Sequence, residues 1–238
     1  MERKQFMKKI SFILKMLTVI SSFSGVLIGL FLAERDGYSH WRTKLMYFTG
    51  LSNLWIGVSV FLLLIAPYTK RLSTDAWIKR LYVLRYIFVV SITVTCLVYC
   101  FLLAPFSEQG NFTPWTFSNI LTHVAAPILA VADFFLDDYK FKITKEHIIF
   151  TAVPPAVYFV FAGILNILDV DFGRGDTYPY FFLNLKSPAG IFGFSDTPPF
   201  VLGSFYWVTL FLLSICGLAL IYSSINNKIL KRNKKSLG

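Results

Sequence analysis

The sequence contains little charge and few cysteines. Only 15% of its 238 residues are charged, whereas a soluble domain carries roughly 25%. The three cysteines, Cys96, Cys100 and Cys216, fall within apolar segments, and neither a CxxC pair nor a Cys/His metal spacing occurs. These shortages argue against a soluble domain, a disulfide framework and a metal site, and nothing in the sequence implies a cofactor.

The chain contains long apolar segments with few charged residues. Hydrophobic residues make up 55% of the chain and aromatic residues 18%, a composition that excludes disorder. Because a membrane crossing needs about 20 residues, we expect one integral membrane domain over residues 1–238. Continuous apolar blocks satisfy their backbone groups in lipid as helices and not as barrel strands. The predicted fold is therefore all-α and polytopic, with six transmembrane helices near residues 10–33, 45–66, 82–104, 116–136, 147–168 and 204–225.

Basic residues are distributed unequally around these six segments. Sixteen lysines and arginines lie on the side of the two termini and five on the other side. The positive-inside rule then places both termini in the cytoplasm of a cell whose plasma membrane the chain spans, with loops near 34–44, 105–115 and 169–203 outside. The net charge of +10 is thus a topology signal and an attraction to anionic lipid headgroups on the cytoplasmic side. No nucleic-acid partner is expected.

A few polar side chains interrupt the apolar segments, where they face the bundle interior and mark packing or function. Lys15 is close enough to its helix start to extend its ammonium group to the cytoplasmic surface. Arg85 and Asp133 are expected at similar depth in antiparallel helices, so we predict a structural ion pair. A proton or ion relay is the alternative, although a transporter normally needs more carboxylates than this one.

Four other polar residues are predicted to converge in the outer leaflet. At 1.5 Å per residue, Thr49 lies roughly 6 Å and His123 roughly 10 Å inside their helices. Asn53 and Asn119 share the respective helix faces at i,i+4 spacing. A neutral imidazole can remove the threonine proton, and a nearby amide can fix the imidazole tautomer or donate to an oxyanion. The pattern predicts a hydrolase core, with interhelical hydrogen bonding as the structural alternative.

The segment 169–203 is rich in aromatic residues but is punctuated by proline and glycine, so it is not a seventh helix. We expect it to lie on the bundle or in the headgroup layer, where tyrosine and phenylalanine are stable. It would serve either as an interfacial anchor or as a lid over a lipid-sized pocket, and the sequence leaves both open.

Three segments resemble a known family. They are YFTGLSNL at 47–54, NILTH at 119–123 followed by Pro127, and YPYFFLN at 178–184. They are similar to the androgen-induced and androgen-dependent TFPI-regulating membrane proteins and their bacterial relatives, six-helix proteins whose animal members are threonine hydrolases of branched fatty-acid esters. The resemblance covers most of the bundle and implies that Thr49 is the nucleophile and His123 its partner.

The predicted function is accordingly an integral membrane hydrolase of lipid or fatty-acid esters that acts from the outer leaflet. Its partner would be a membrane lipid or fatty-acid ester substrate, with Asn53 and Asn119 in supporting roles. The competing class is a non-enzymatic multi-pass protein, either a small transporter or a scaffold, in which the same polar groups join helices.

Overall fold

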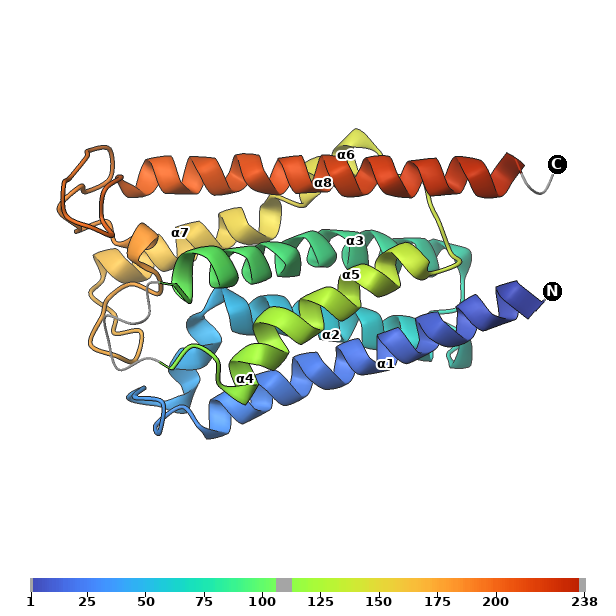
Figure 1. Ribbon diagram of the computed structural model, residues 1–238, viewed down its shortest axis with the longest axis horizontal. Helices are drawn as coiled ribbons and strands as arrows, with labels where there is room; N and C mark the ends of the chain where they lie inside the picture. Colours follow the sequence, from blue (N-terminus) through green and yellow to red (C-terminus); the bar gives the residue numbers. More distant parts are fainter. Residues whose placement is uncertain (1, 106–112, 236–238) are drawn as a thin grey trace.

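The computed structural model describes residues 2–105 and 113–235, and its regular secondary structure over these residues is entirely helical (Figure 1). Within these two ranges, six helical stretches are long and apolar enough to span a membrane. The predicted six-helix, multi-pass fold is therefore confirmed. The predicted loop 105–115 falls mostly on residues 106–112, which lie outside the described residues. The six spans are Gln5–Phe31, Phe48–Tyr68, Asp75–Leu103, Phe117–Leu136, Lys145–Ile167 and Ser204–Asn233.

Several spans are composed of more than one helical element. The α-helices are α1 (Glu2–Phe31), α2 (Phe48–Ile65), α3 (Asp75–Val98), α4 (Phe117–Ile120), α5 (Ala126–Leu136), α6 (Lys145–Phe150), α7 (Val153–Ile167) and α8 (Ser204–Lys235). Two π-helical turns, η3 (Tyr99–Leu103) and η5 (Leu121–Ala125), continue α3 and join α4 to α5. The described residues also contain three short 3₁₀ helices, η1 (Trp41–Met46), η2 (Ala66–Tyr68) and η6 (Phe181–Leu183).

Three helices are longer than their apolar cores. The first starts by Glu2 and not at residue 10, the third starts at Asp75 and not at 82, and the last continues to Lys235 and not to 225. The prediction followed hydropathy, which marks only the part of a helix that crosses hydrocarbon. Lysine and arginine are good helix formers, so these helices continue through their charged ends.

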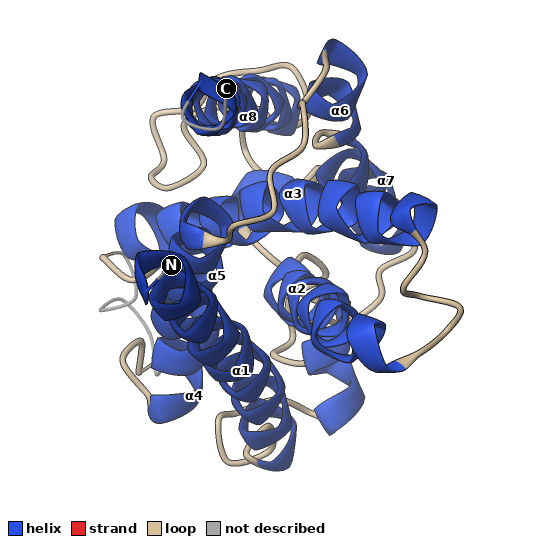
Figure 2. Ribbon diagram, turned by 90° about the vertical axis from the view of Figure 1, so that its right-hand side faces the viewer, coloured by secondary structure: helices blue, strands red, loops and turns tan. Residues whose placement is uncertain are grey.

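Both termini lie at one end of the bundle, the termini end (Figure 1). The opposite end, which we call the loop end, carries η1 and the segment 169–203 (Figure 1). Seen along the bundle, α3 lies between α8 and a group formed by α1, α2 and α5 (Figure 2). Large apolar side chains on the outside are exposed, including Ile128, Val160 and Leu213, as expected where helices face lipid.

Candidate active site

A cavity of about 390 Å³ lies at the loop end, between α1, α2, the fourth span and the loop 169–203. Thr49 and His123 line it, and residues 178–181 of the loop form part of its wall. Asn166 of α7 anchors this loop, because its amide nitrogen donates to the Thr177 carbonyl at 3.0 Å and its oxygen accepts from the Leu185 N–H at 3.0 Å. The loop thus covers a cavity, while Phe192 and Phe194 further along it are exposed.

Thr49 and His123 are in direct contact, as the predicted convergence requires. Thr49 Oγ1 lies 3.1 Å from His123 Nε2. The other ring nitrogen, Nδ1, lies 3.1 Å from the backbone carbonyl oxygen of Asn119. A carbonyl only accepts, so Nδ1 carries the proton and Nε2 of the neutral ring is free to accept from the threonine hydroxyl. The arrangement is that of an alcohol with an adjacent base whose tautomer is fixed.

Two further residues hold the imidazole ring, and the sequence did not point to either. Tyr99 of η3 stacks on it, with ring centroids 3.7 Å apart and an interplanar angle of 23°. The Tyr99 hydroxyl donates to the Pro114 carbonyl, which anchors the stack. Thr122 Oγ1 donates to the Ser118 carbonyl at 2.9 Å and lies 3.1 Å from His123 Nδ1. The ring is therefore restrained from its face and from its Nδ1 edge.

The π-helical turn η5 explains why Asn53 is buried beside this site. Ala126 N–H donates to the Leu121 carbonyl five residues earlier. The next such bond would use the N–H of Pro127, which does not exist. Asn53 supplies the missing donor, because its Nδ2 lies 3.0 Å from the Thr122 carbonyl and 2.9 Å from the Thr49 carbonyl. Asn53 thus joins the segments that carry Thr49 and His123 through their backbones, and neither of its two hydrogen bonds goes to the imidazole.

The side-chain amide of Asn119 is not bonded to the imidazole, although fixing the imidazole tautomer was one of the two roles that the sequence suggested for a nearby amide. Its Nδ2 donates to the Pro114 carbonyl at 2.9 Å, so only its backbone carbonyl reaches His123. The helix start explains this, because the Thr116 side chain accepts from the Asn119 N–H and the amide folds back over the same turn. Within residues 2–105 and 113–235, no carboxylate is hydrogen-bonded to His123.

Tyr180 of the loop lies close to Thr49 and lines the same cavity. Burial raises the pKa of Tyr180 to about 12, although hydrogen bonding to the Thr49 side chain and backbone lowers it. The hydroxyl therefore keeps its proton at neutral pH and can donate. Its ring is held by Tyr47 and Phe182, at centroid distances of 5.8 and 5.1 Å. The recurrence of aromatic residues in the loop was visible in the sequence, but nothing there selected Tyr180.

Charged side chains also line the cavity. Lys44 and Arg174 both line it and both lie over the ring of Tyr38, at 4.7 and 4.2 Å from the centroid. Lys44 Nζ also donates to Asp36 at 2.9 Å. Burial lowers the pKa of Lys44, partly offset by Asp36, which raises it. The wall of the cavity thus combines charged and polar side chains with apolar ones.

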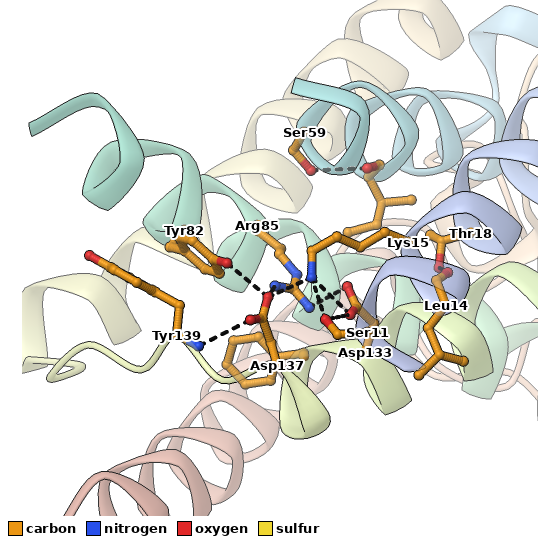
Figure 3. Close-up of polar contacts among 12 residues, drawn as sticks. Ser11, Leu14, Lys15, Thr18, Ser59, Tyr82, Arg85, Asp133, Asp137 and Tyr139 are labelled. Carbon is orange, nitrogen blue, oxygen red and sulfur yellow. Dashed lines mark hydrogen bonds and ion pairs between the residues drawn. The ribbon is translucent and has the colours of Figure 1, made fainter. Parts of the chain in front are cut away.

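A second polar cluster lies toward the termini end, where Figure 3 shows four charged side chains meeting. Arg85 donates through Nη2 to Asp133 at 2.5 Å and through Nη1 to Asp137 at 2.7 Å. Lys15 donates to Asp133 at 3.1 Å and to Asp137 at 2.7 Å. The cluster joins α1, α3 and the end of α5, and its two cations balance its two carboxylates. The contact between Arg85 and Asp133 is the one that the helix depths predicted.

The interpretation of Lys15 as a residue extending to the membrane surface is wrong. Its side chain is buried and also donates to Ser11 Oγ at 2.5 Å. Asp137, just past the end of α5, supplies the second carboxylate that the sequence-based count of intramembrane charges omitted. Burial raises the pKa of Asp137, but Arg85 and Lys15 lower it by more, so the pKa lies below its usual range. The predicted two-residue ion pair is thus part of a neutral four-residue cluster.

No group of three or more histidine, cysteine, aspartate or glutamate side chains that could hold a metal ion lies in the described part of the chain. No family model, curated protein or solved structure matches the chain. The family resemblance of the three motifs therefore stays a prediction.

Proposed function

We propose that the chain is an integral membrane hydrolase of lipid or fatty-acid esters, with Thr49 as nucleophile and His123 as base. The observation that carries the proposal is the 3.1 Å contact between Thr49 Oγ1 and His123 Nε2 in the wall of a cavity, with Nδ1 facing a backbone carbonyl. A threonine hydroxyl becomes a useful nucleophile when an adjacent base takes its proton. The resemblance to the membrane threonine hydrolases supports the same assignment.

The reaction would proceed in two halves. Thr49 Oγ1 bonds to the ester carbonyl carbon while its proton moves to His123 Nε2, and the tetrahedral intermediate then expels the alcohol, which takes the proton from His123. Water adds to the acyl-threonine and gives its proton to His123. Collapse of this second intermediate releases the carboxylic acid, and Thr49 Oγ1 recovers the proton.

The developing oxyanion needs donors near Thr49. Tyr180 is one candidate, because its protonated hydroxyl lies beside Thr49. The start of α2 offers others, since Thr49 is the second residue of that helix and the first-turn N–H groups of a helix have no partner within it. Such preorganised donors are a major source of transition-state stabilisation in acyl transfer.

The membrane arrangement is part of this proposal. With the basic residues concentrated at the termini end, both termini would be cytoplasmic and the cavity would open at the outer leaflet of the plasma membrane. An ester lipid in that leaflet could then reach the cavity without crossing the bilayer. The protein would also attract anionic lipid headgroups on its cytoplasmic side.

A fluorophosphonate activity-based probe tests the proposal directly. The purified full-length chain in detergent should form one adduct, which peptide mass spectrometry should locate at Thr49. His123→Ala should abolish labelling because the hydroxyl loses its base. Labelling at another residue, or ester hydrolysis by a Thr49→Ala chain at the wild-type rate, would contradict the assignment and favour a transporter or scaffold.

A further inference from the structure

A smaller space adjoins the cavity behind the nucleophile. It is a slot of about 40 Å³ between α2, α3, α7 and α8. Thr49, Tyr180 and Leu103 line both the cavity and the slot. The proposed nucleophile and oxyanion donor therefore stand at the boundary between two spaces of very different size.

The two spaces also differ in chemistry. Beyond Thr49 the slot is bounded by Val94, Phe211 and Ile215. The hydroxyl groups nearby are already engaged, since Thr95 Oγ1 lies 2.9 Å from Ser52 Oγ and the Tyr158 hydroxyl donates to the Met46 carbonyl at 3.1 Å. The cavity, in contrast, is lined by charged and polar side chains as well as apolar ones. The slot suits a hydrocarbon group and little else.

The position of His123 decides which part of an ester lies in which space. The departing alcohol oxygen must take its proton from His123, and His123 lines the cavity but is not among the residues that line the slot. The alcohol must therefore lie in the cavity when the carbonyl carbon is at Thr49 Oγ1. The acyl chain, on the other side of that carbon, then points into the slot.

We propose that the slot is the acyl site and that it selects esters of a short acyl chain with a larger, lipid-like alcohol. This inference rests on the proposed hydrolase function. The slot has room for about three water-sized spheres, and hence about three methylene groups. The much larger cavity takes the alcohol and, after it leaves, the water that hydrolyses the acyl-threonine.

The first experiment measures kcat/KM of the full-length chain for 4-methylumbelliferyl esters of acetic, butanoic, octanoic and hexadecanoic acids. The alcohol is constant, and each value is divided by the uncatalysed rate of the same ester. We expect the maximum at acetate or butanoate and a fall of about ten-fold or more at octanoate. A maximum at octanoate or hexadecanoate would overturn the acyl-site assignment.

Variants at Val94 cancel the differences in how the esters partition into detergent, because each ester is compared between the wild-type chain and a variant. Val94→Ala should raise the octanoate-to-butanoate ratio of kcat/KM by roughly ten-fold, as expected for about two additional carbon atoms of space. Val94→Phe should lower butanoate relative to acetate. Val90→Ala is the matched control, since Val90 lies one turn earlier on α3, is buried and lines neither space; it should leave both ratios unchanged.

The outcomes separate the two proposals. If Thr49 is labelled and the wild-type chain hydrolyses esters, but the Val94 variants leave the ratios unchanged, the acyl-site proposal fails and the hydrolase proposal stands. If no ester is hydrolysed and Thr49 takes no probe, both fail. Probe labelling of each Val94 variant confirms that the site is still assembled.

Discussion

At the scale of single residues, Thr49 and His123 allow function to be separated from folding. We expect Thr49→Ala and His123→Ala each to abolish ester hydrolysis. Thermal unfolding of Thr49→Ala should stay near that of the wild type, because Asn53 still joins α2 to the fourth span, whereas His123→Ala also removes the ring on which Tyr99 stacks. Thr49→Ser keeps the hydroxyl and should retain appreciable activity. Since residues that act as a unit are non-additive, the double variant should be scarcely less active than either single one.

The outcome that would contradict this prediction is a Thr49→Ser chain as inactive as Thr49→Ala, provided that both fold. Circular dichroism melting in detergent supplies that control. An inactive but folded Thr49→Ser chain would indicate that packing of the threonine methyl group is what matters at position 49.

Tyr99 is a second residue whose role can be measured. Its ring stacks on the imidazole and is buried, so we assign it to positioning His123. Tyr99→Phe keeps the ring and should retain most of kcat. Tyr99→Leu frees the imidazole face and should lower kcat by up to about 100-fold, the cost of a misplaced catalytic group, with a smaller change in KM. Equal activity of the two variants in steady-state assays would remove Tyr99 from this role.

At the scale of elements, the cluster of Lys15, Arg85, Asp133 and Asp137 connects α1, α3 and α5. Arg85→Met leaves two carboxylates facing one lysine, so it should cost about 3 to 5 kcal/mol. Arg85→Met with Asp133→Leu restores neutrality and should cost much less than the sum of the single changes. Melting curves of the four chains in detergent provide the double-mutant cycle, and additive losses would disprove the coupling.

Lys15 supplies an independent measurement on the same cluster. Replacing a lysine whose ammonium group reaches the surface with methionine costs little stability. Replacing Lys15, in contrast, leaves Arg85 as the one cation of the cluster that faces Asp133 and Asp137. We expect Lys15→Met to destabilise the protein by an amount similar to that of Arg85→Met. Lys8→Met is a suitable control because Lys8 is an exposed lysine on the same helix.

The pH dependence of stability should reflect Asp137. Its pKa in the folded chain is lowered below the ordinary value of 3.8, so its ionised form stabilises the fold above that value. This stabilisation is lost as the pH falls below about 4, where the unfolded chain binds the proton first. Melting temperatures measured by circular dichroism at a series of acidic pH values check this prediction. The melting temperature of Asp137→Asn should fall less with decreasing pH than that of the wild type.

At the scale of the whole molecule, topology is the property that the charge pattern predicts. We expect both termini and the connection between α2 and α3 to be cytoplasmic, with the segment 169–203 outside. In a chain whose native cysteines are replaced by alanine, single cysteines at Asp196 and Ser73 should respond oppositely to an impermeant maleimide in intact cells. Both positions are exposed. Protection of Asp196→Cys together with labelling of Ser73→Cys would reverse the orientation.

The sequence by itself determined the six spans, because an apolar stretch of about 20 residues has no other stable solution in lipid than a helix. It also determined the depths of Thr49, His123, Arg85 and Asp133, since the rise per residue of a helix is fixed. Those two kinds of information were enough to predict which helices bring polar groups to the same level. They were not enough to predict which atoms meet.

The tertiary structure alone decided the details of both polar clusters. Lys15 joins the charged cluster because α1 packs against α5, and helix periodicity carries no information about which helix lies beside which. Asn119 acts through its carbonyl and Asn53 replaces the N–H that Pro127 lacks, because a π-helical turn shifts the register of the fourth span. Tyr99 and Tyr180 come from segments distant in sequence from Thr49. Such contacts depend on helix rotation and loop packing, which are properties of the assembled bundle.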